Sequence, residues 1–167
     1  MARYRKPRKI TYTMENAVGL NGLTRLELEM TVRMALNEIA KHANVEFERV
    51  KKGQKGKITI RTYPRDFMKA LGRKNYYPLG LQFRWGIALN TSRPLTKKQS
   101  YMLVLHELLH WMGLKHNTDT DSVMNINLTS TDLTDYDIKR LQRRWGKKYR
   151  QMYHTFPDGY KCLMREV

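Results

Sequence analysis

The chain has 167 residues, of which 41% are hydrophobic, and this is enough apolar material to bury one core in a single domain. A single cysteine, Cys162, excludes an intrachain disulfide, so the fold does not depend on an oxidising compartment. The 32 Lys and Arg residues outnumber the 15 Asp and Glu residues, and the net charge of +17 favours an anionic partner such as nucleic acid, an acidic polypeptide or an anionic surface.

The sequence contains no segment that predicts insertion into a membrane. No apolar run approaches the ~20 residues that a membrane span needs. The N-terminal arm, residues 1–8, is basic and leads into alternating residues, so we expect no ordinary secretory signal in this chain. Cytoplasmic, virion-associated and secreted locations, the last after removal of a leader, all stay open. The sequence predicts no particular oligomeric state.

The first elements expected along the chain are a strand and a long helix. Alternating side chains over 9–14 predict a short strand. Thr24 and Glu27 have the spacing of a capping box, and the apolar residues behind them recur at helical spacing, so 24–42 is predicted to be an amphipathic helix. His42 lies at its C-terminal end, where a cation suits the helix dipole, and we expect it to cap rather than to bind metal.

The middle of the chain favours further strands. Residues 45–50 and 57–63 have the pattern of two strands, joined by a turn that is rich in Lys and contains Gly. The signals over 64–78 are weak and mixed. Residues 79–90 are apolar and aromatic enough for one strand or for a close pair that is broken near Gly86.

Two more helices are predicted after the strands. Thr96 and Gln99 form a second capping box, which begins a helix that runs through Trp111. A third helix begins at residues 134–137, and Gly146 is placed to end it.

The element order, β-α-β-β-β(β)-α-α, predicts an α+β domain. We expect three parts: the basic arm 1–8, one folded domain over 9–146, and a tail over 147–167 that shows no clear periodicity.

The segment that carries chemistry runs from His106 to His116 and reads His-Glu-Leu-Leu-His-Trp-Met-Gly-Leu-Lys-His. On a helix, His106 and His110 project from the same face, so both imidazoles can reach one Zn²⁺. Gly113 can take a positive φ, end the helix and bring His116 back as the third ligand. Three protein ligands leave a position open for water, which is typical of a catalytic zinc site, and Glu107 lies near enough to act as a general base.

The alternative interpretation is that these are three ordinary histidines on a partly buried helix. It leaves unexplained why three of only five histidines fall within eleven residues. Ordinary residue usage produces the full spacing by chance in roughly one chain in 10⁵.

The spacing from His106 to His116 resembles that of the metzincin zinc endopeptidases, and the residues after it most closely resemble the matrixin branch. Residues 117–124, Asn-Thr-Asp-Thr-Asp-Ser-Val-Met, look like the matrixin stretch that leads to the Met-turn, with Met124 at the matching offset. Residues 134–146 are similar to the final matrixin helix. The resemblance implies a metzincin-like α+β fold, in which a twisted mixed β-sheet accompanies an active-site helix and a C-terminal helix after the Met-turn.

The resemblance also implies a zinc metalloendopeptidase that holds one catalytic Zn²⁺ and hydrolyses peptide or protein substrates. In such an enzyme zinc polarises the scissile carbonyl and a water molecule, while Glu107 takes the proton of the water and later delivers it to the leaving amine. Met124 would form a hydrophobic base under the three imidazoles without binding the metal. The strand near 79–83 would hold an extended substrate by backbone pairing.

The chain also departs from the matrixin pattern. Asn117 follows the third histidine, where matrixins usually carry Ser, and Asn125-Ile126 replaces the Tyr-Pro that normally follows the Met-turn. No histidine lies between His42 and His106, and acidic residues are few there, so we expect neither a structural zinc ion nor calcium. The chain contains no cysteine-switch prodomain.

Two other classes of function stay open. A non-catalytic binding or assembly protein, for example in a virus particle, would keep the fold and the zinc and dock through its basic surface, although the intact Glu107 argues against this. A nucleic-acid-binding protein would use residues 139–150, of which seven of twelve are basic, but the chain shows no recognised nucleic-acid signature.

Overall fold

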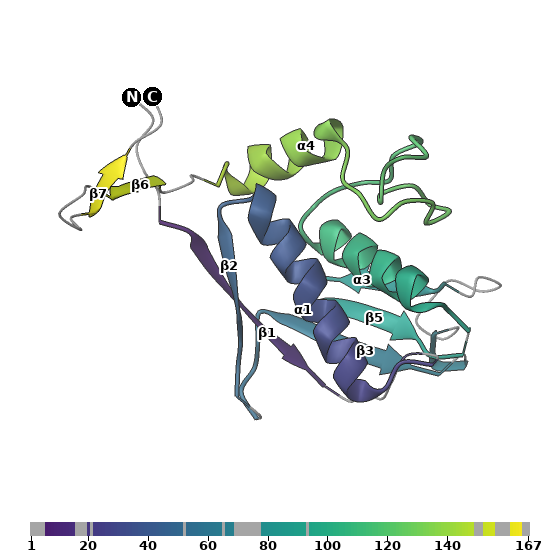
Figure 1. The fold of residues 1–167 in the computed structure, drawn as a ribbon. Coiled ribbons are helices and arrows are strands. Elements are labelled where there is room, and N and C mark those ends of the chain that lie inside the picture. The colour runs from purple at the N-terminus through teal and green to yellow at the C-terminus, as the bar shows by residue number, and fades with distance from the viewer. Residues whose placement is uncertain are drawn as a thin grey trace.

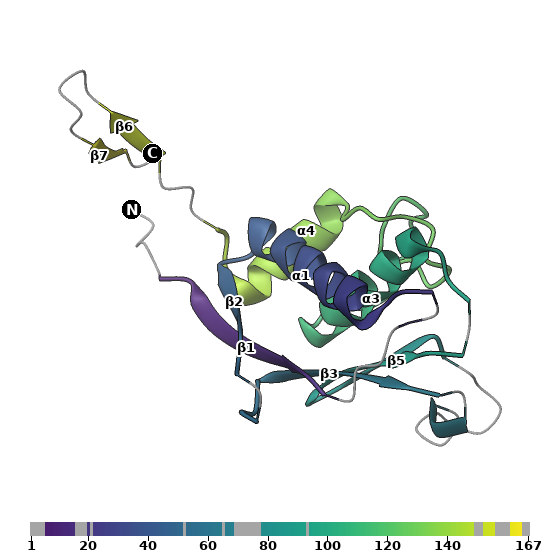
Figure 2. The same cartoon turned by 60° about the horizontal axis from the view of Figure 1, so that its bottom comes forward.

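The computed structural model has an α+β fold, in which one mixed five-stranded sheet carries the helices on one of its faces (Figures 1 and 2). The structure describes residues 6–15, 20, 22–51, 53–64, 66–68, 78–92 and 94–148, together with the backbone of 152–155 and 161–164. In chain order the elements are β1 (Arg8–Met14), α1 (Arg25–His42), β2 (Val45–Arg49), β3 (Ile58–Tyr63), β4 (Gly80–Phe83), β5 (Gly86–Asn90), α3 (Lys97–Trp111), α4 (Asp135–Trp145), β6 (Met152–Thr155) and β7 (Lys161–Met164).

The five-stranded sheet has the order β2-β1-β3-β5-β4. The first three neighbouring pairs are parallel, and only the edge strand β4 runs antiparallel, against β5. The apolar stretch 79–90 therefore forms a close pair of strands, as one of the two expectations had it. Gly86 is the first residue of the second strand. Only glycine fits at this position, because a Cβ there would stand 1.9 Å from the carbonyl oxygen of Thr59 on β3.

The core lies between the sheet and the helices α1 and α3 (Figure 2). The apolar face predicted for the first helix is the buried one, and its fully buried members include Leu28, Val32 and Ile39. Sheet residues such as Ile60 and Leu89 complete the same cluster. Leu105 and Leu109 of α3 belong to the same cluster. Burying one such Leu or Ile side chain contributes about 1.5–3 kcal/mol to folding, so the cluster holds α3 against the sheet.

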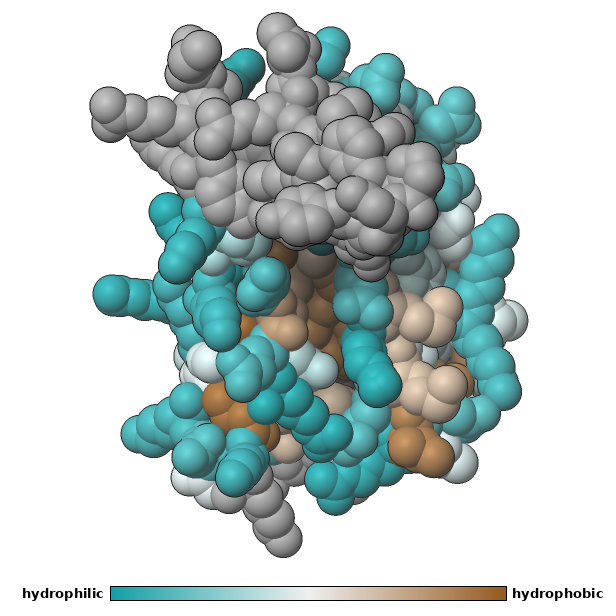
Figure 3. Space-filling view, turned by 60° about the vertical axis from the view of Figure 1, so that its left-hand side comes forward, coloured by the Kyte–Doolittle hydropathy of each residue, from teal (hydrophilic) through white to brown (hydrophobic). Residues whose placement is uncertain are grey.

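Figure 3 shows hydrophilic side chains over most of the described residues on one face, with apolar side chains visible between them. On α1, the side chains of Leu26, Met30 and Met34 are exposed and follow one another at intervals of one helical turn. In the part of the chain that the structure describes, no helix combines the length and the apolar character needed to cross a membrane.

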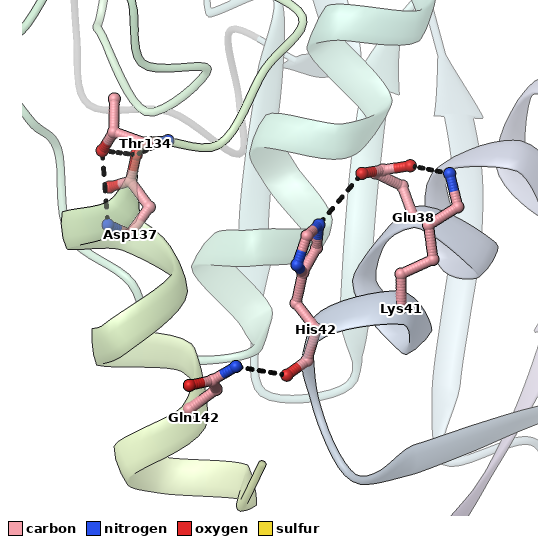
Figure 4. A network of polar contacts seen from close by, with 6 residues as sticks. All are labelled: Glu38, Lys41, His42, Thr134, Asp137 and Gln142. Atoms are coloured by element: carbon pink, nitrogen blue, oxygen red, sulfur yellow. Dashed lines mark hydrogen bonds and ion pairs between the residues drawn. The ribbon is translucent and has the colours of Figure 1, made fainter. Parts of the chain in front are cut away.

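Helix α4 is joined to the C-terminal end of α1 by a hydrogen bond (Figure 4). The side-chain amide of Gln142 donates to the carbonyl oxygen of His42 at 3.1 Å. The ring of His42 faces Glu38, which also pairs with Lys41. His42 thus lies in the last turn of its helix as predicted. The chain leaves α4 at Gly146, whose φ of +84° confirms the predicted end of that helix.

The C-terminal tail contains two short paired strands. Residues 147–167 show no periodicity in the sequence, yet β6 and β7 pair as an antiparallel hairpin, with Met152 opposite Met164 and Thr155 opposite Lys161. Strands of four residues place only two side chains on each face, which is too few for alternation to be recognised. The sequence therefore gave no signal for either strand.

Candidate metal site

Helix α3 carries two of the three histidines and is buried over most of its length. It begins with the predicted capping box, in which the hydroxyl of Thr96 accepts from the backbone N–H of Gln99 at 3.1 Å and the side chain of Gln99 accepts from the backbone N–H of Thr96 at 2.9 Å. The helix packs against α1, β4 and β5. Because it is enclosed in this way, its residues 102–109 are all buried, and these include His106 and Glu107.

The three histidines converge. Each offers a ring nitrogen, and these nitrogens all lie within 4.8 Å of one another. The Nε2 atoms of His110 and His116 are 3.0 Å apart, and the ring centroids of His106 and His110 are 4.6 Å apart. Two nitrogens that bind one tetrahedral Zn²⁺ at the usual bond length stand about 3.3 Å apart. The described residues contain no other such group of three or more His, Cys, Asp or Glu side chains.

Backbone carbonyls orient the two helical imidazoles. The carbonyl oxygen of Val123 lies 2.7 Å from Nδ1 of His106, and that of Leu114 lies 2.8 Å from Nδ1 of His110. Since a carbonyl oxygen can only accept, each Nδ1 donates its hydrogen, and the Nε2 atom of the neutral ring keeps its lone pair. Metal-binding histidines in proteins are commonly held in this way.

The turn after α3 brings His116 back to the helix, as the sequence predicted. Gly113 has a φ of +100°, a conformation that glycine adopts without steric cost. Its N–H bonds to the carbonyl of His110 at 2.9 Å, and the N–H of Leu114 bonds to that of Leu109 at 3.0 Å. These bonds end the helix and reverse the chain. The turn is what allows three candidate ligands to come from only eleven residues of sequence.

The electrostatics of the site favour neutral imidazoles. Burial lowers the pKa of His106 to about 4 and also lowers the pKa of His110. The bonds to the backbone carbonyls act in the opposite direction, while the neighbouring imidazoles lower both values further. A neutral imidazole is the form that binds a metal ion, so burial favours the metal-binding form of His106 and His110.

Glu107 lies in the same hollow as the histidines. This hollow, of about 360 Å³, is lined by side chains from β4, α3 and the loop after it, including Glu107, His106, His110 and His116. Burial raises the pKa of Glu107 to about 8. Its carboxyl group lies directly against β4, because a Cβ built on Gly80 would stand 2.6 Å from Oε1 of Glu107.

Met124 is completely buried in the core and does not line the hollow. The hydroxyl of Ser122 accepts from the backbone N–H of Met124 at 2.9 Å and donates to Oδ2 of Asp137 at 2.6 Å. Asp137 is fully buried and also accepts from Thr134 at the start of α4. The carbonyl that orients His106 belongs to Val123, between Ser122 and Met124. Asp137 therefore holds the backbone that orients a candidate ligand.

Sequence reasoning missed this role of Ser122 and Asp137. It placed Asp137 only at the start of the third helix, since Ser122 and Asp137 are fifteen positions apart and no spacing rule joins them. The one sequence feature that could have indicated this role is Asp137 itself, an acidic residue in the first turn of the helix that follows Met124.

Comparison with known proteins does not identify the chain. No protein-family model matches it, and neither does any curated protein sequence.

Proposed function

We propose that the chain is a zinc-dependent endopeptidase of the metzincin type, most similar to the matrixins, with Glu107 as its general base. The observation that carries the proposal is the convergence of His106, His110 and His116 beside a buried carboxyl group in one hollow. A helix presenting the first two, and a glycine turn returning the third, give the arrangement of a three-ligand catalytic site.

The residues present fit Zn²⁺. Imidazole nitrogen is among its preferred ligands, and the 3.0 Å separation of the His110 and His116 nitrogens is close to that of a shared tetrahedral ion. His106, His110 and His116 would hold it. A zinc ion with three protein ligands supplies Lewis acidity to a carbonyl oxygen and lowers the pKa of water.

Glu107 would move the protons. Hydrolysis of a peptide bond needs a base that takes a proton from the attacking water and an acid that returns one to the leaving amine. A carboxylate oxygen of Glu107 does both in turn. Its burial against Gly80 fixes the side chain and keeps bulk water away from it. A nearby cation lowers the pKa of a buried carboxyl group and so favours the ionised base.

The edge strand β4 would hold the substrate. Within the described residues it pairs only with β5, so its other edge is available for an extended peptide to add by backbone hydrogen bonds. The hollow of about 360 Å³ beside it includes the apolar residues Leu81, Leu103 and Ile126, which suit an apolar substrate side chain. Met124 and Ser122 would support the site from the core without touching substrate.

The test is digestion of a mixed peptide library by the purified, zinc-loaded protein, with mapping of the cleavage sites. We expect cleavage that a chelator removes and that added zinc restores. The matched control is Glu107→Gln, which keeps the volume of the side chain and should retain zinc. Cleavage by this variant at the wild-type rate would show that a contaminating protease is responsible or that Glu107 is not the base. Bound zinc with no cleavage of any peptide would instead favour a non-catalytic protein.

A further inference from the structure

Exposed cations gather on one side of the histidine site. A second hollow, of about 540 Å³, lies beside His110 and His116, and the residues that line it are Gln82, His110, Gly113, Leu114, Lys115 and His116. Lys115 is exposed, so its ammonium group is available at the wall of this hollow.

Helix α4 brings two guanidinium groups against the turn that lines this hollow. A Cβ built on Gly113 would stand 2.3 Å from Nη1 of Arg144, so the Arg144 guanidinium lies against the turn that lines the hollow. Nη1 of Arg140 is 3.5 Å from the carbonyl oxygen of Lys115. The indole N–H of Trp145 donates to the carbonyl of Met112 at 2.7 Å, which fixes this end of α4 beside the end of α3.

A fourth cation approaches from the sheet. Arg84 is exposed in the turn between β4 and β5, and its carbonyl accepts from the indole N–H of Trp111 at 3.3 Å. The Trp111 ring stacks with that of Trp145, their centroids 6.1 Å apart. Three separate segments of the chain thus bring basic residues to the same end of α3, of which Arg84, Lys115 and Arg144 are exposed and Arg140 is partly buried. We call Arg84, Lys115, Arg140 and Arg144 the basic rim.

The basic rim has no carboxylate partners within the described part of the chain. The ion pairs among the described residues involve other cations, none of them in the basic rim. These cations belong to α1, β2, β3 and the start of α3, and they are Arg25, Lys41, His42, Arg49, Arg61 and Lys97. Among the residues that the structure describes, Glu107 has the only carboxyl group that lines either hollow. The rim therefore carries positive charges that no described carboxylate contacts as an ion pair, and such a cluster attracts a ligand of opposite charge.

We infer that the basic rim selects acidic peptide segments, an inference that rests on the proposed endopeptidase function. Gln82 of β4 and Lys115 line the same hollow, so a peptide paired with β4 would pass beside Lys115. Arg144 lies against Gly113, which lines that hollow too. Glu or Asp side chains of that peptide then accept charge-assisted hydrogen bonds, and a guanidinium group can bind a carboxylate with two parallel bonds. The edge of β4 matches a peptide backbone, which favours an acidic peptide over a nucleic acid as the ligand.

The test uses three fluorogenic peptides that share the residues around the scissile bond and carry three Glu, three Gln or three Lys on one side of it. A second set carries them on the other side. On one side of the scissile bond, the zinc-loaded wild type should cleave the Glu peptide with a kcat/KM at least about tenfold above the Gln peptide, mainly through KM. This preference should shrink with added salt because the paired charges are exposed. Equal kcat/KM for Glu, Gln and Lys peptides in both sets would overturn the inference.

Two charge reversals of equal size separate the basic rim from the overall charge. Lys115→Glu with Arg144→Glu should abolish the preference for Glu. Lys51→Glu with Lys55→Glu makes the same change in net charge in the turn between β2 and β3, at the opposite edge of the sheet, and should retain it. The milder pair Lys115→Gln with Arg144→Gln should weaken the preference and guards against misfolding of the reversed variant. Equal loss in the Lys51/Lys55 variant would overturn the role of the rim.

A binding measurement distinguishes failure of this inference from failure of the protease proposal. Fluorescence anisotropy should show that zinc-loaded Glu107→Gln binds the Glu peptide at least about tenfold more tightly than the Gln peptide. If the wild type cleaves no peptide but this binding persists, the protease proposal fails and the acidic ligand stands. Cleavage without any charge preference leaves the protease and removes the acidic ligand. Tighter binding of a single-stranded oligonucleotide, lost with Lys115→Glu and Arg144→Glu, would replace the peptide by a nucleic acid.

Discussion

The contact between Glu107 and β4 makes Gly80→Ala an informative change. The added methyl group would stand 2.6 Å from Oε1 and 2.7 Å from Cδ of Glu107. Non-bonded carbon atoms rest about 3.5–4.0 Å apart, so the carboxyl group must move by about 1 Å. Misplacement of a catalytic group by about 1 Å costs about 10²-fold in rate. We therefore expect kcat for peptide cleavage to fall by about 10²-fold while zinc stays bound.

Three measurements on Gly80→Ala separate displacement of the base from general damage. Peptide-cleavage kinetics should show the loss in kcat, and metal analysis should find the zinc content of the wild type. Thermal unfolding should reveal a destabilisation of about 1–3 kcal/mol, which is ordinary for an overpacked site. Glu107→Gln sets the floor of activity. If Gly80→Ala cleaves at the wild-type rate while Glu107→Gln is inactive, the working position of the carboxylate is not the one against β4.

Three further predictions concern the base, the support of the site and acid stability. Glu107→Gln should keep its zinc and fold and lose at least ~10²-fold in kcat, the usual scale of general-base catalysis; a wild-type rate would exclude this role. Ser122→Ala removes the group that joins Met124 to Asp137, so isothermal titration should show about 10–100-fold weaker zinc binding, as for other outer-shell partners of metal ligands, and unchanged affinity would refute the proposed support. Arg49 lowers the pKa of Glu29 through hydrogen bonds at 2.8 and 2.9 Å. A carboxyl group whose pKa is lowered by folding stabilises the fold at pH values above its unfolded pKa near 4.5, and this stabilisation is lost as the pH falls. The unfolding free energy of Arg49→Gln should therefore drop less between pH 6 and pH 3 than that of the wild type, by up to about 1 kcal/mol. Parallel curves for the two proteins would contradict this.

Features encoded within a few residues were predictable from the sequence. The capping boxes at Thr24 and Thr96 begin their helices as expected, because a cap joins a side chain to a backbone group three residues away. The third helix also begins after Thr134, as predicted. The approach of His106, His110 and His116 was predictable for the same reason. Two ligands share a helix face, and Gly113 is one of the few residues that can reverse the chain so sharply.

Features that join distant segments were not predictable. The contact between Gly80 and Glu107 depends on how β4 lies on α3, and nothing in either local sequence specifies it. The buried bond between Ser122 and Asp137 and the position of Arg144 beside Gly113 depend in the same way on the docking of α4. Charge counts showed that the chain is basic, but only the fold brings four of its cations to one end of α3.

A zinc titration of catalysis tests the proposed site in a single measurement. Protein freed of metal by a chelator and then dialysed is given zinc in steps, and the rate of peptide cleavage is measured at each step. The three-histidine site predicts a linear rise that ends at one zinc per chain, and no rise in His110→Ala. Cleavage without zinc, a rise that continues to two zinc ions per chain, or full activity in His110→Ala would contradict it.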